Sequence, residues 1–363
     1  MSGDAARPVL IAAGGTGGHV YPALATAREL ADRSVPVVWL GTKAGLEGRV
    51  LPGTGIVVEW LEIAALRGKG WLGWLTGPWR LVKAVLAARR VIRRRRPRAV
   101  LGLGGYVAAP AGIAARMAGV PLVIHEQNAV PGLANRLSAR WAARILTGFP
   151  GAFSGAAEWV GNPVRSEIAA LPPPETRMAA RTGRSRLLVL GGSQGALALN
   201  RAVPAAVAAL AVERRPEILH QAGAATVERA RAAYREAGVD ADVVEYIEEM
   251  DRAYAWADLV VARAGALTIA ELAAAGVGAV FVPLPWAADD HQTANARFLA
   301  AAGAAEVLPQ KDLEEGALAD LLAGLLADRE RLLRMAVAAR GLARPDAASR
   351  VADACLEVSD DDE

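Results

Sequence analysis

Each half of this chain opens with the same order of segments: an apolar strand pattern, a glycine-rich turn and a helical pattern. In the first half these segments are Pro8–Ala13, Gly14–His19 and Val20–Arg33, and in the second they are Arg186–Leu190, Gly191–Gly195 and Ala196–Leu210. A buried strand that runs through a tight turn into a helix is the opening unit of parallel α/β sheets. The repeated order predicts an α/β fold with two Rossmann-like parallel-sheet domains that face each other across a cleft.

Further short apolar segments, most of them separated by helical patterns, support parallel sheets in both halves. They are Pro36–Leu40, Ile56–Leu61, Ala99–Leu103, Pro121–His125 and Arg144–Thr147 in the first half, and Glu217–His220, Val243–Ile247, Asp258–Ala262 and Ala279–Pro283 in the second. The turn Gly161-Asn162-Pro163 separates the two series. We predict a first domain over residues 1–163, a second over residues 164–343, and a C-terminal helix with an acidic tail over residues 344–363 that packs back toward the first domain.

Composition limits the compartment and the metal chemistry that are possible. The chain has 363 residues, of which 53% are hydrophobic, and this is sufficient for two buried cores. The single cysteine, Cys355, excludes an intramolecular disulfide and a multi-cysteine zinc site. Asp240-Ala241-Asp242 matches a metal-binding acidic string but is interpreted as a solvated loop, so we predict no metal and no cofactor. No secretory signal or run of ~20 apolar residues is visible, which predicts a cytoplasmic protein without a membrane span.

Three glycine-rich turns follow predicted strands. The first holds Gly14, Gly15, Thr16, Gly17, Gly18 and His19, the second is Gly191–Gly195, and the third holds Gly104, Gly105 and Tyr106. Glycine lets the backbone approach a ligand closely, and a helix start presents amides to an anion. Each turn alone fits a purely structural role equally well. Three turns at the edge where open α/β sheets bind ligands favour a phosphate-bearing ligand.

Polar residues in the first half mark candidate catalytic positions. His19 has the chemistry of a general base, although a helix-start residue that hydrogen-bonds the backbone is an equal alternative. The block His125–Asn128 is predicted to leave the end of a strand and to form a polar cluster at the edge of the sheet. Its alternative is a turn with solvated side chains.

The second half carries two further polar groups at predicted helix starts. Arg263–Thr268 leads into a helix that carries Glu271, which is either a ligand for a ribose diol or a residue that complements the helix dipole. Asp289–Gln292 and Asn295 begin the next helix, where they supply partners for sugar hydroxyls. One of the two aspartates is interpreted as a helix cap.

An aromatic and basic segment predicts contact with an anionic membrane surface. Its apolar members are Trp71, Trp74, Leu75, Trp79, Val82 and Val85, and they interleave with Arg80, Lys83, Arg89 and Arg90. An ordinary packed helix with a solvated basic face is one alternative. A nucleic-acid patch is another, but the aromatic residues cluster at one end of the segment, and we predict no nucleic-acid partner.

In their order along the chain, these blocks resemble the MurG family within glycosyltransferase family 28. The blocks are Gly14–Pro22, Gly104–Val107, His125–Asn128, Gly161–Arg165, Gly191–Gly195 and Arg263–Glu271. The resemblance covers nearly the whole chain and implies a GT-B fold, with the acceptor in the N-terminal domain and the donor in the C-terminal domain. It implies an inverting, metal-independent transfer of N-acetylglucosamine from UDP-GlcNAc to undecaprenyl-pyrophosphoryl-MurNAc-pentapeptide (lipid I). The product is lipid II of peptidoglycan synthesis, made at the cytoplasmic face of the cell membrane by a peripheral protein.

The resemblance also implies roles for individual residues. The donor-binding set is Thr16, Gly17, Gly18, Asn128, Arg165, Ser193, Ile247, Arg263, Ala266, Leu267, Thr268, Glu271, Gln292 and Asn295. Within it, the backbone of Ile247 would meet uracil, amides near Leu267 the diphosphate, and Glu271 the ribose. His19 and Glu126 are rival catalytic residues, and the sequence does not decide between them.

Other functions stay open at this point. One is a related GT-B transferase that acts on another lipid acceptor, and another is a non-catalytic UDP-sugar-binding protein. A nicotinamide-dependent dehydrogenase is disfavoured because no acidic residue clearly ends the second strand. The expected partners are UDP-GlcNAc, lipid I and an anionic membrane surface.

Overall fold

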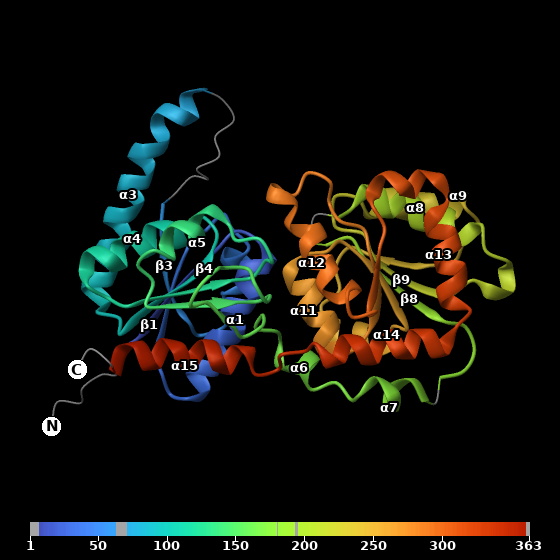
Figure 1. Ribbon diagram of the computed structural model, residues 1–363. Coiled ribbons are helices and arrows are strands. Elements are labelled where there is room, and N and C mark those ends of the chain that lie inside the picture. Colours follow the sequence, from blue (N-terminus) through green and yellow to red (C-terminus); the bar gives the residue numbers. More distant parts are fainter. Residues whose placement is uncertain (1–6, 63–70, 180, 193–194, 361–363) are drawn as a thin grey trace. The chain divides into compact units, whose positions relative to one another are not determined.

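A computed structural model of the chain describes residues 7–62, 71–179, 181–192 and 195–360 (Figure 1). For residues 71–76, 288, 314, 315 and 360 it describes the backbone alone. The chain divides into two compact units, one formed by residues 1–165 with 344–363 and the other by residues 166–343. Each unit contains a parallel sheet with helices packed on it, so the predicted α/β class with two parallel-sheet domains is confirmed.

The sheet described in the first unit has seven parallel strands in the order β3-β2-β1-β4-β5-β6-β7. The strands are β1 (Val9–Ala13), β2 (Val37–Gly41), β3 (Val57–Trp60), β4 (Ala99–Gly104), β5 (Leu122–Glu126), β6 (Arg144–Thr147) and β7 (Glu158–Trp159). The helices are α1 (Gly17–Asp32), α2 (Glu47–Val50), α3 (Trp71–Arg95), α4 (Ala108–Ala118), α5 (Leu133–Ser138) and, from the end of the chain, α15 (Ala347–Asp360).

The sheet described in the second unit has six parallel strands in the order β10-β9-β8-β11-β12-β13. The strands are β8 (Arg186–Leu190), β9 (Glu217–Gln221), β10 (Asp242–Val244), β11 (Leu259–Ala262), β12 (Gly278–Phe281) and β13 (Ala305–Val307). The α-helices are α6 (Ser166–Ala169), α7 (Pro174–Ala179), α8 (Leu197–Ala208), α9 (Val227–Glu236), α10 (Met250–Trp256), α11 (Ala266–Ala275), α12 (His291–Ala300), α13 (Ala317–Leu326) and α14 (Arg329–Gly341). Short 3-10 helices lie at Val212–Arg214, Ala288–Asp290 and Gln310–Glu315.

Both sheets have a point where the strand order reverses. In the first sheet β1 lies between β2 and β4, and in the second β8 lies between β9 and β11. The crossovers on the two sides of such a point run in opposite directions along the sheet, and open α/β sheets bind their ligands at the carboxyl ends of the strands there. Three predicted turns, those after β1, β4 and β8, and the Arg263–Gly265 loop after β11 all lie at these ends.

Alternation along the central strand β1 divides the first unit's core into two layers. Val9, Ile11 and Ala13 pack with apolar residues of α1 and α15, whereas Leu10 and Ala12 pack with residues of α3 and α4. All five residues of β1 are buried. A strand that is covered on both faces must be apolar throughout, which explains why this segment reads as a continuous apolar run.

Element boundaries differ from the predicted ones at three functional positions. Helix α1 begins at Gly17 and not at Val20, because Thr16 keeps an extended backbone and ends the turn. Strand β5 continues to Glu126, since its last residues still pair with β6, so the prediction that the His125–Asn128 block leaves the strand was wrong for its first two residues. Strand β10 ends at Val244, which places Ile247 in the loop beyond it.

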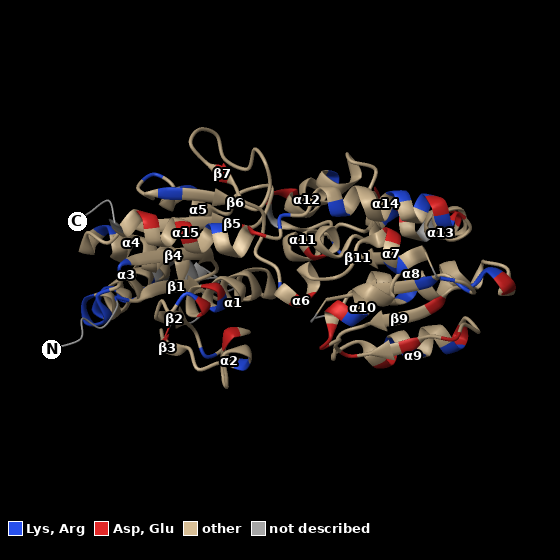
Figure 2. Ribbon diagram, turned by 90° about the horizontal axis from the view of Figure 1, so that it is seen from below, with Lys and Arg blue, Asp and Glu red and all other residues tan. Residues whose placement is uncertain are grey.

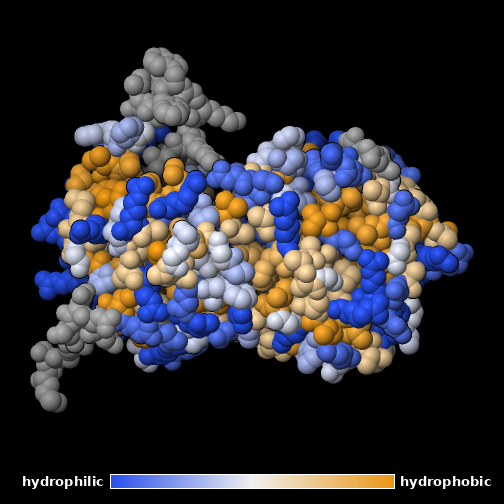
Figure 3. Space-filling view, in the orientation of Figure 1, coloured by the Kyte–Doolittle hydropathy of each residue, from blue (hydrophilic) through white to orange (hydrophobic). Residues whose placement is uncertain are grey.

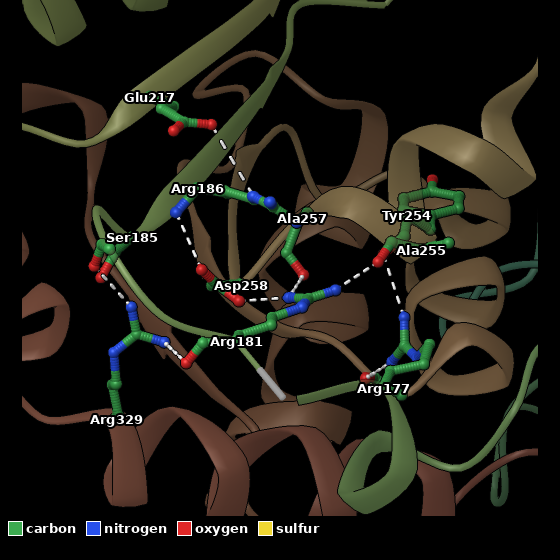
Figure 4. Close-up of polar contacts among 12 residues, drawn as sticks. Arg177, Arg181, Ser185, Arg186, Glu217, Tyr254, Ala255, Ala257, Asp258 and Arg329 are labelled. Atoms are coloured by element: carbon green, nitrogen blue, oxygen red, sulfur yellow. Dashed lines mark hydrogen bonds and ion pairs between the residues drawn. The ribbon is translucent and has the colours of Figure 1, made fainter. Parts of the chain in front are cut away.

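A group of arginines ties the start of the second unit to its helices (Figure 4). Arg177 of α7 donates to the carbonyls of Tyr254, Ala275 and Gly276, which lie at the C-terminal ends of α10 and α11. Burial, with the neighbouring arginine charges, lowers the pKa of Arg177 to about 10. Its guanidinium thus donates to carbonyls at helix ends, where the last C=O groups receive no hydrogen bond from within the helix.

Arg181 forms the buried ion pair of this group. It pairs with the Asp258 carboxylate, and the side chains of the two residues are only 9% and 3% exposed. Asp258 also accepts a hydrogen bond from the backbone N–H of Arg186, the first residue of β8, at 2.9 Å. The carboxylate therefore joins the segment before the sheet to the sheet itself.

We predict that Asp258→Ala lowers the free energy of unfolding by about 3–5 kcal/mol, because it leaves the Arg181 guanidinium buried without its counter-charge. Urea unfolding measures the effect. Glu249→Ala is the matched control, since Glu249 pairs with Arg252 through side chains that are 61% and 75% exposed, and its loss costs about 0–1 kcal/mol. Equal losses in the two variants would contradict the prediction.

Candidate active site

Two glycine turns of the first unit are in close contact at the carboxyl ends of β1 and β4. Gly15, Gly104 and Gly105 have φ angles of +95°, +101° and +78°, which favour glycine. A side chain at Gly105 would collide with the Gly14 carbonyl, and one at Gly104 would lie 2.8 Å from the His19 ring. Gly104 and Gly105 are thus required both for the backbone angles and for the close contact, whereas at Gly15 only the φ angle favours glycine.

His19 lies in the first turn of α1, where the structure leaves it half-buried. Its Nδ1 lies 3.4 Å from the hydroxyl oxygen of Thr16, the residue that caps the helix start. Gly17 and Gly18 complete this first turn, so their amides belong to the end of the helix where N–H groups lack intrahelical acceptors. The half-exposed Tyr106 borders the turn from the β4 side, with its ring 3.9 Å from where a side chain at Gly15 would begin.

The predicted polar block at the end of β5 is largely interior. His125, Glu126 and Gln127 are all buried, which excludes for these three residues the alternative of a turn with solvated side chains. The Nε2 of His125 lies 2.8 Å from the carbonyl of Gly161, and burial lowers the pKa of its imidazole. His125 is therefore held neutral inside the unit.

The Glu126 carboxylate is saturated with hydrogen-bond donors. One oxygen accepts from the backbone N–H and the side-chain amide of Asn128, at 2.9 and 3.2 Å. The other accepts from the backbone N–H of Gly132 at 3.0 Å and from the side chain of Asn135 at 2.9 Å. A carboxylate offers about four acceptor sites, so Glu126 is committed to holding residues 127–132 in place.

Arg165 and Asn162 come from the predicted block at the end of the first unit's sheet. The Arg165 guanidinium lies over the ring of Tyr21 at 5.5 Å, which places it beside the first turn of α1. Asn162 is buried and donates to the carbonyl of Gln127 at 3.0 Å. Arg165 therefore lies near the start of α1, and Asn162 supports the loop after β5.

The second glycine turn is packed closely against β9. A side chain at Gly195 would collide with the carbonyl of Ala222 and the hydroxyl of Thr226. Ser193, predicted to contact the donor, lies outside the described residues. Behind the turn, His220 of β9 is completely buried and bonds Tyr234 at 2.9 Å and Asn200 at 3.1 Å. Burial lowers the pKa of His220 to about 4.

The loop after β11 leads directly into a helix start. Gly265 caps α11, and Ala266, Leu267 and Thr268 form its first turn, where amides favour an anion. Glu271, one turn further, is buried and accepts a hydrogen bond from the Tyr254 hydroxyl at 3.0 Å.

Three residues predicted to bind the donor also have structural partners in the second unit. Arg263 donates to the carbonyls of Val282 and Pro283 and to the side chain of Gln310, and burial lowers its pKa. Gln292 accepts from the backbone N–H of Leu284 at 2.9 Å, through its side-chain oxygen. Asn295 is completely buried and donates to the carbonyl of Ala264 at 3.2 Å.

No group of three or more potential ligands in the described part of the chain is arranged to hold a metal ion. Asp240 and Asp242 of the acidic string are both exposed, and Asp242 is the first residue of β10. The described residues also contain no helix that is long and apolar enough to cross a membrane.

Helix α3 divides the predicted membrane residues between two faces. Val85 is buried in the core beside Ala88 and Ile92, so its assignment to a membrane surface was wrong. Trp79 and Val82 are 63% and 47% exposed. The side chains of Trp71, Trp74 and Leu75 lie outside those that the structure describes.

Basic and exposed apolar side chains lie together around α3. Figure 2 shows arginines gathered near the end of the helix, and Figure 3 shows apolar and hydrophilic side chains side by side on the part of the first unit that carries it. α4 packs against α3, and α5 packs against α4. Exposed apolar residues recur on these neighbours, namely Met117 on α4 and Leu133 and Leu137 on α5.

Comparison with known proteins identifies the family. The model of the glycosyltransferase family 28 N-terminal domain matches residues 9–147, and that of the family 28 C-terminal domain matches residues 186–351. The chain belongs to glycosyltransferase family 28. The predicted family and the predicted enzyme class, a hexosyltransferase, are thereby confirmed.

Individual relatives of this family 28 glycosyltransferase match it over nearly its whole length. It is 62% identical to the UDP-N-acetylglucosamine--N-acetylmuramyl-(pentapeptide) pyrophosphoryl-undecaprenol N-acetylglucosamine transferase of Halorhodospira halophila, over 97% of this chain and 99% of the relative. The enzyme of the same name from Alkalilimnicola ehrlichii is 57% identical, over 96% and 98%. The crystal structure of Acinetobacter baumannii MurG superposes with a TM-score of 0.84 at 40% identity, over 97% of this chain and 99% of that one.

Two buried residues of this family 28 glycosyltransferase were missed by the sequence reasoning. Glu47 is completely buried next to the first glycine turn, and Asn135 is buried against Glu126. Each lies on a short helix, and a single polar residue there carries no periodic signal. Only the length of the polar block at residues 125–128 pointed toward the surroundings of Asn135.

We predict that the buried His220 makes this family 28 glycosyltransferase less stable at acidic pH. Its folded pKa of about 4 lies below the ordinary value of 6.5, so the unfolded chain takes up the proton first as the pH falls. Stability is lost as the pH falls through the range between these values, by about 3 kcal/mol in full. Urea unfolding at a series of pH values from roughly 7 down to 4 measures this loss of unfolding free energy.

His220→Gln supplies the comparison for this titration. The variant keeps a polar side chain near Asn200 and Tyr234 but has no group that titrates in this range. The difference in unfolding free energy between wild type and variant should shrink as the pH falls, because the contributions of all other titrating groups cancel. A constant difference would refute the assignment.

Proposed function

We propose that this chain transfers N-acetylglucosamine from UDP-GlcNAc to lipid I, undecaprenyl-pyrophosphoryl-MurNAc-pentapeptide, and thereby forms lipid II in peptidoglycan synthesis. The observation that carries the proposal is the 62% identity to a relative of that name over 97% of the chain. The placement of a half-buried histidine and of helix-start amides at the switch points of the two sheets supports it. Inversion at the anomeric carbon and independence of metal belong to the same proposal.

The second unit is assigned to the donor. Amides of Ala266, Leu267 and Thr268 at the start of α11 bind the diphosphate, where the helix dipole stabilises the charge that develops as UDP leaves. Glu271, which Tyr254 holds in place, binds the ribose diol. The backbone of Ile247, in the loop after β10, meets the uracil.

The hydrogen bonds that the other predicted UDP-GlcNAc-binding residues make within the protein separate them into groups. The side-chain oxygen of Gln292 is used by Leu284, so its amide N–H₂ is the end that we assign to a GlcNAc hydroxyl. Asn295 and Arg263 hold the loops after β11 and β12 through backbone carbonyls, and we assign them to positioning. Thr16, Gly17, Gly18, Asn128, Arg165 and Ser193 remain predicted donor contacts.

The first unit is assigned to the acceptor, with His19 as the general base. A base must come within hydrogen-bond reach of the acceptor hydroxyl. His19 is half-buried at the end of the sheet, whereas Glu126 is 2% exposed and already accepts four hydrogen bonds. In the proposed step the imidazole takes the hydroxyl proton, the oxygen forms the new bond to the anomeric carbon, and the bond to UDP breaks on the opposite face.

We expect wild-type protein to transfer radiolabelled GlcNAc from UDP-GlcNAc to a short-chain lipid I analogue in the presence of EDTA. His19→Ala should lower kcat about 10²–10⁴-fold, the contribution of general base catalysis, while calorimetry still detects UDP-GlcNAc binding. If a folded wild type bound UDP-GlcNAc without transfer, the lipid I acceptor would be wrong, and another lipid acceptor or a binding-only role would take its place. Full activity of His19→Ala would show that His19 is not the general base.

We further propose that the first unit binds the cytoplasmic face of the cell membrane as a peripheral protein. The support comes from the exposed face of α3, where Trp79, Val82 and Leu86 recur at helical spacing among basic residues. Lys83 lies over the Trp79 ring at 5.5 Å, so one site presents both an apolar ring and a cation. Apolar contact and attraction to anionic headgroups then act together.

Combined replacement of Trp79, Val82 and Leu86 by serine should weaken sedimentation with phosphatidylglycerol vesicles at least tenfold, because each buried side chain contributes about 1.5–3 kcal/mol. The control is Val212→Ser with Val337→Ser, two exposed residues of the second unit. Unchanged vesicle binding by the α3 variant would contradict the proposed surface.

A further inference from the structure

We infer that Glu47 is a positioning residue for the transfer reaction, because it holds the first glycine turn in the conformation that presents His19. The inference rests on the proposed function. Glu47 is the first residue of the short helix α2, and its side chain is 0% exposed. A buried carboxylate is costly unless its oxygens are hydrogen-bonded, so its partners show what it does.

The carboxylate joins two separate turns. Its Oε2 accepts from the backbone N–H of Gly15 at 2.9 Å. Its Oε1 accepts from the backbone N–H and the hydroxyl of Thr42, at 2.9 and 2.8 Å. A return contact runs from the N–H of Leu46 to the carbonyl of Gly15, at 3.4 Å. Gly15 is therefore bonded on both its amide and its carbonyl to the segment at residues 42–47.

Glycines from three segments make room for this carboxylate. A side chain at Gly14 would begin 2.5 Å from Oε1, and one at Gly41 would begin 2.9 Å from Cγ of Glu47. A side chain at Gly45 would collide with Oε2. From the opposite side, Gly105 lies against the Gly14 carbonyl. The turn after β1 is thus confined between the Glu47 carboxylate and the turn after β4.

The backbone conformation at Gly15 determines where the His19 side chain lies. Gly15 has a φ of +95°, Thr16 follows as the extended cap residue, and the N–H of His19 donates to the Thr16 carbonyl at 3.1 Å. A rotation of the Gly15 peptide would shift the start of α1 and the ring of His19 with it. Only an acceptor at Glu47 fits, because the groups that converge on it are N–H and O–H donors.

The decisive variant is Glu47→Gln, which keeps the shape but places an N–H₂ group against one of the two backbone N–H groups. Thr42→Val is the matched control, since it removes one hydrogen bond to the same carboxylate and leaves the Gly15 bond intact. We expect Glu47→Gln to lower kcat about 10- to 100-fold, as sub-ångström to 1 Å misplacement does, with the Kd for UDP-GlcNAc changed less than about twofold. Thr42→Val should keep kcat within about twofold. If kcat instead fell in both variants in proportion to their loss of stability in urea, Glu47 would be merely structural.

Gly45→Ala provides a second route to the same displacement, because the added methyl group would push Oε2 away from Gly15. Its control is Gly324→Ala on α13, where the methyl group meets nothing within 4 Å. Gly45→Ala should reproduce the kcat loss of Glu47→Gln, and Gly324→Ala should not. This pair keeps the inference testable if Glu47→Gln fails to fold, and wild-type kcat in Gly45→Ala would overturn it.

Hydrogen exchange separates this inference from the proposed function. In peptides that span the first glycine turn, exchange should accelerate at least tenfold in Glu47→Gln and stay at the wild-type rate in Thr42→Val, whether or not lipid I is the acceptor. Absence of wild-type transfer together with faster exchange in Glu47→Gln would reject the acceptor and keep the positioning of the turn. Unchanged exchange would reject the positioning role.

Discussion

The site of the first unit depends on a contact between two stretches of backbone, Gly105 against the carbonyl of Gly14. Strands β1 and β4 are neighbours at the point where the strand order reverses, so the turns that follow them meet at one edge of the sheet. No side chain fits between these turns, and this close approach places the start of α1 at the sheet edge. The second unit has a similar close backbone contact, with Gly195 against the carbonyl of Ala222.

Polar residues buried near these turns hydrogen-bond the backbone of the site loops. Glu47, Glu126 and Asn295 each hold a loop through its amides or carbonyls. Their hydrogen bonds satisfy groups that would otherwise be costly to bury. A carboxylate whose acceptor sites are filled has none left for an acceptor hydroxyl. This distinguishes Glu126 from the half-buried His19.

The sequence predicted the parallel sheets and the turns because continuous apolar runs and glycine clusters are local signals. It missed Glu47 because the partner that matters, Gly15, is distant along the chain and meets it only through the sheet order. The polar block at His125 was expected at the edge of the sheet, but its burial was not foreseen, since sequence alone does not show that buried acceptors and donors will match. On α3, Val85 and Val82 look alike in sequence, yet only the first faces the core.

The proposed membrane face and the proposed base belong to one continuous piece of the first unit. The turn at Gly104–Tyr106 runs directly into α4, and α3 packs along α4. A lipid-linked acceptor bound at the proposed membrane face would thus meet the proposed base within the same unit. The donor is water-soluble and imposes no such requirement, which agrees with a basic and apolar face on the unit proposed to bind the acceptor.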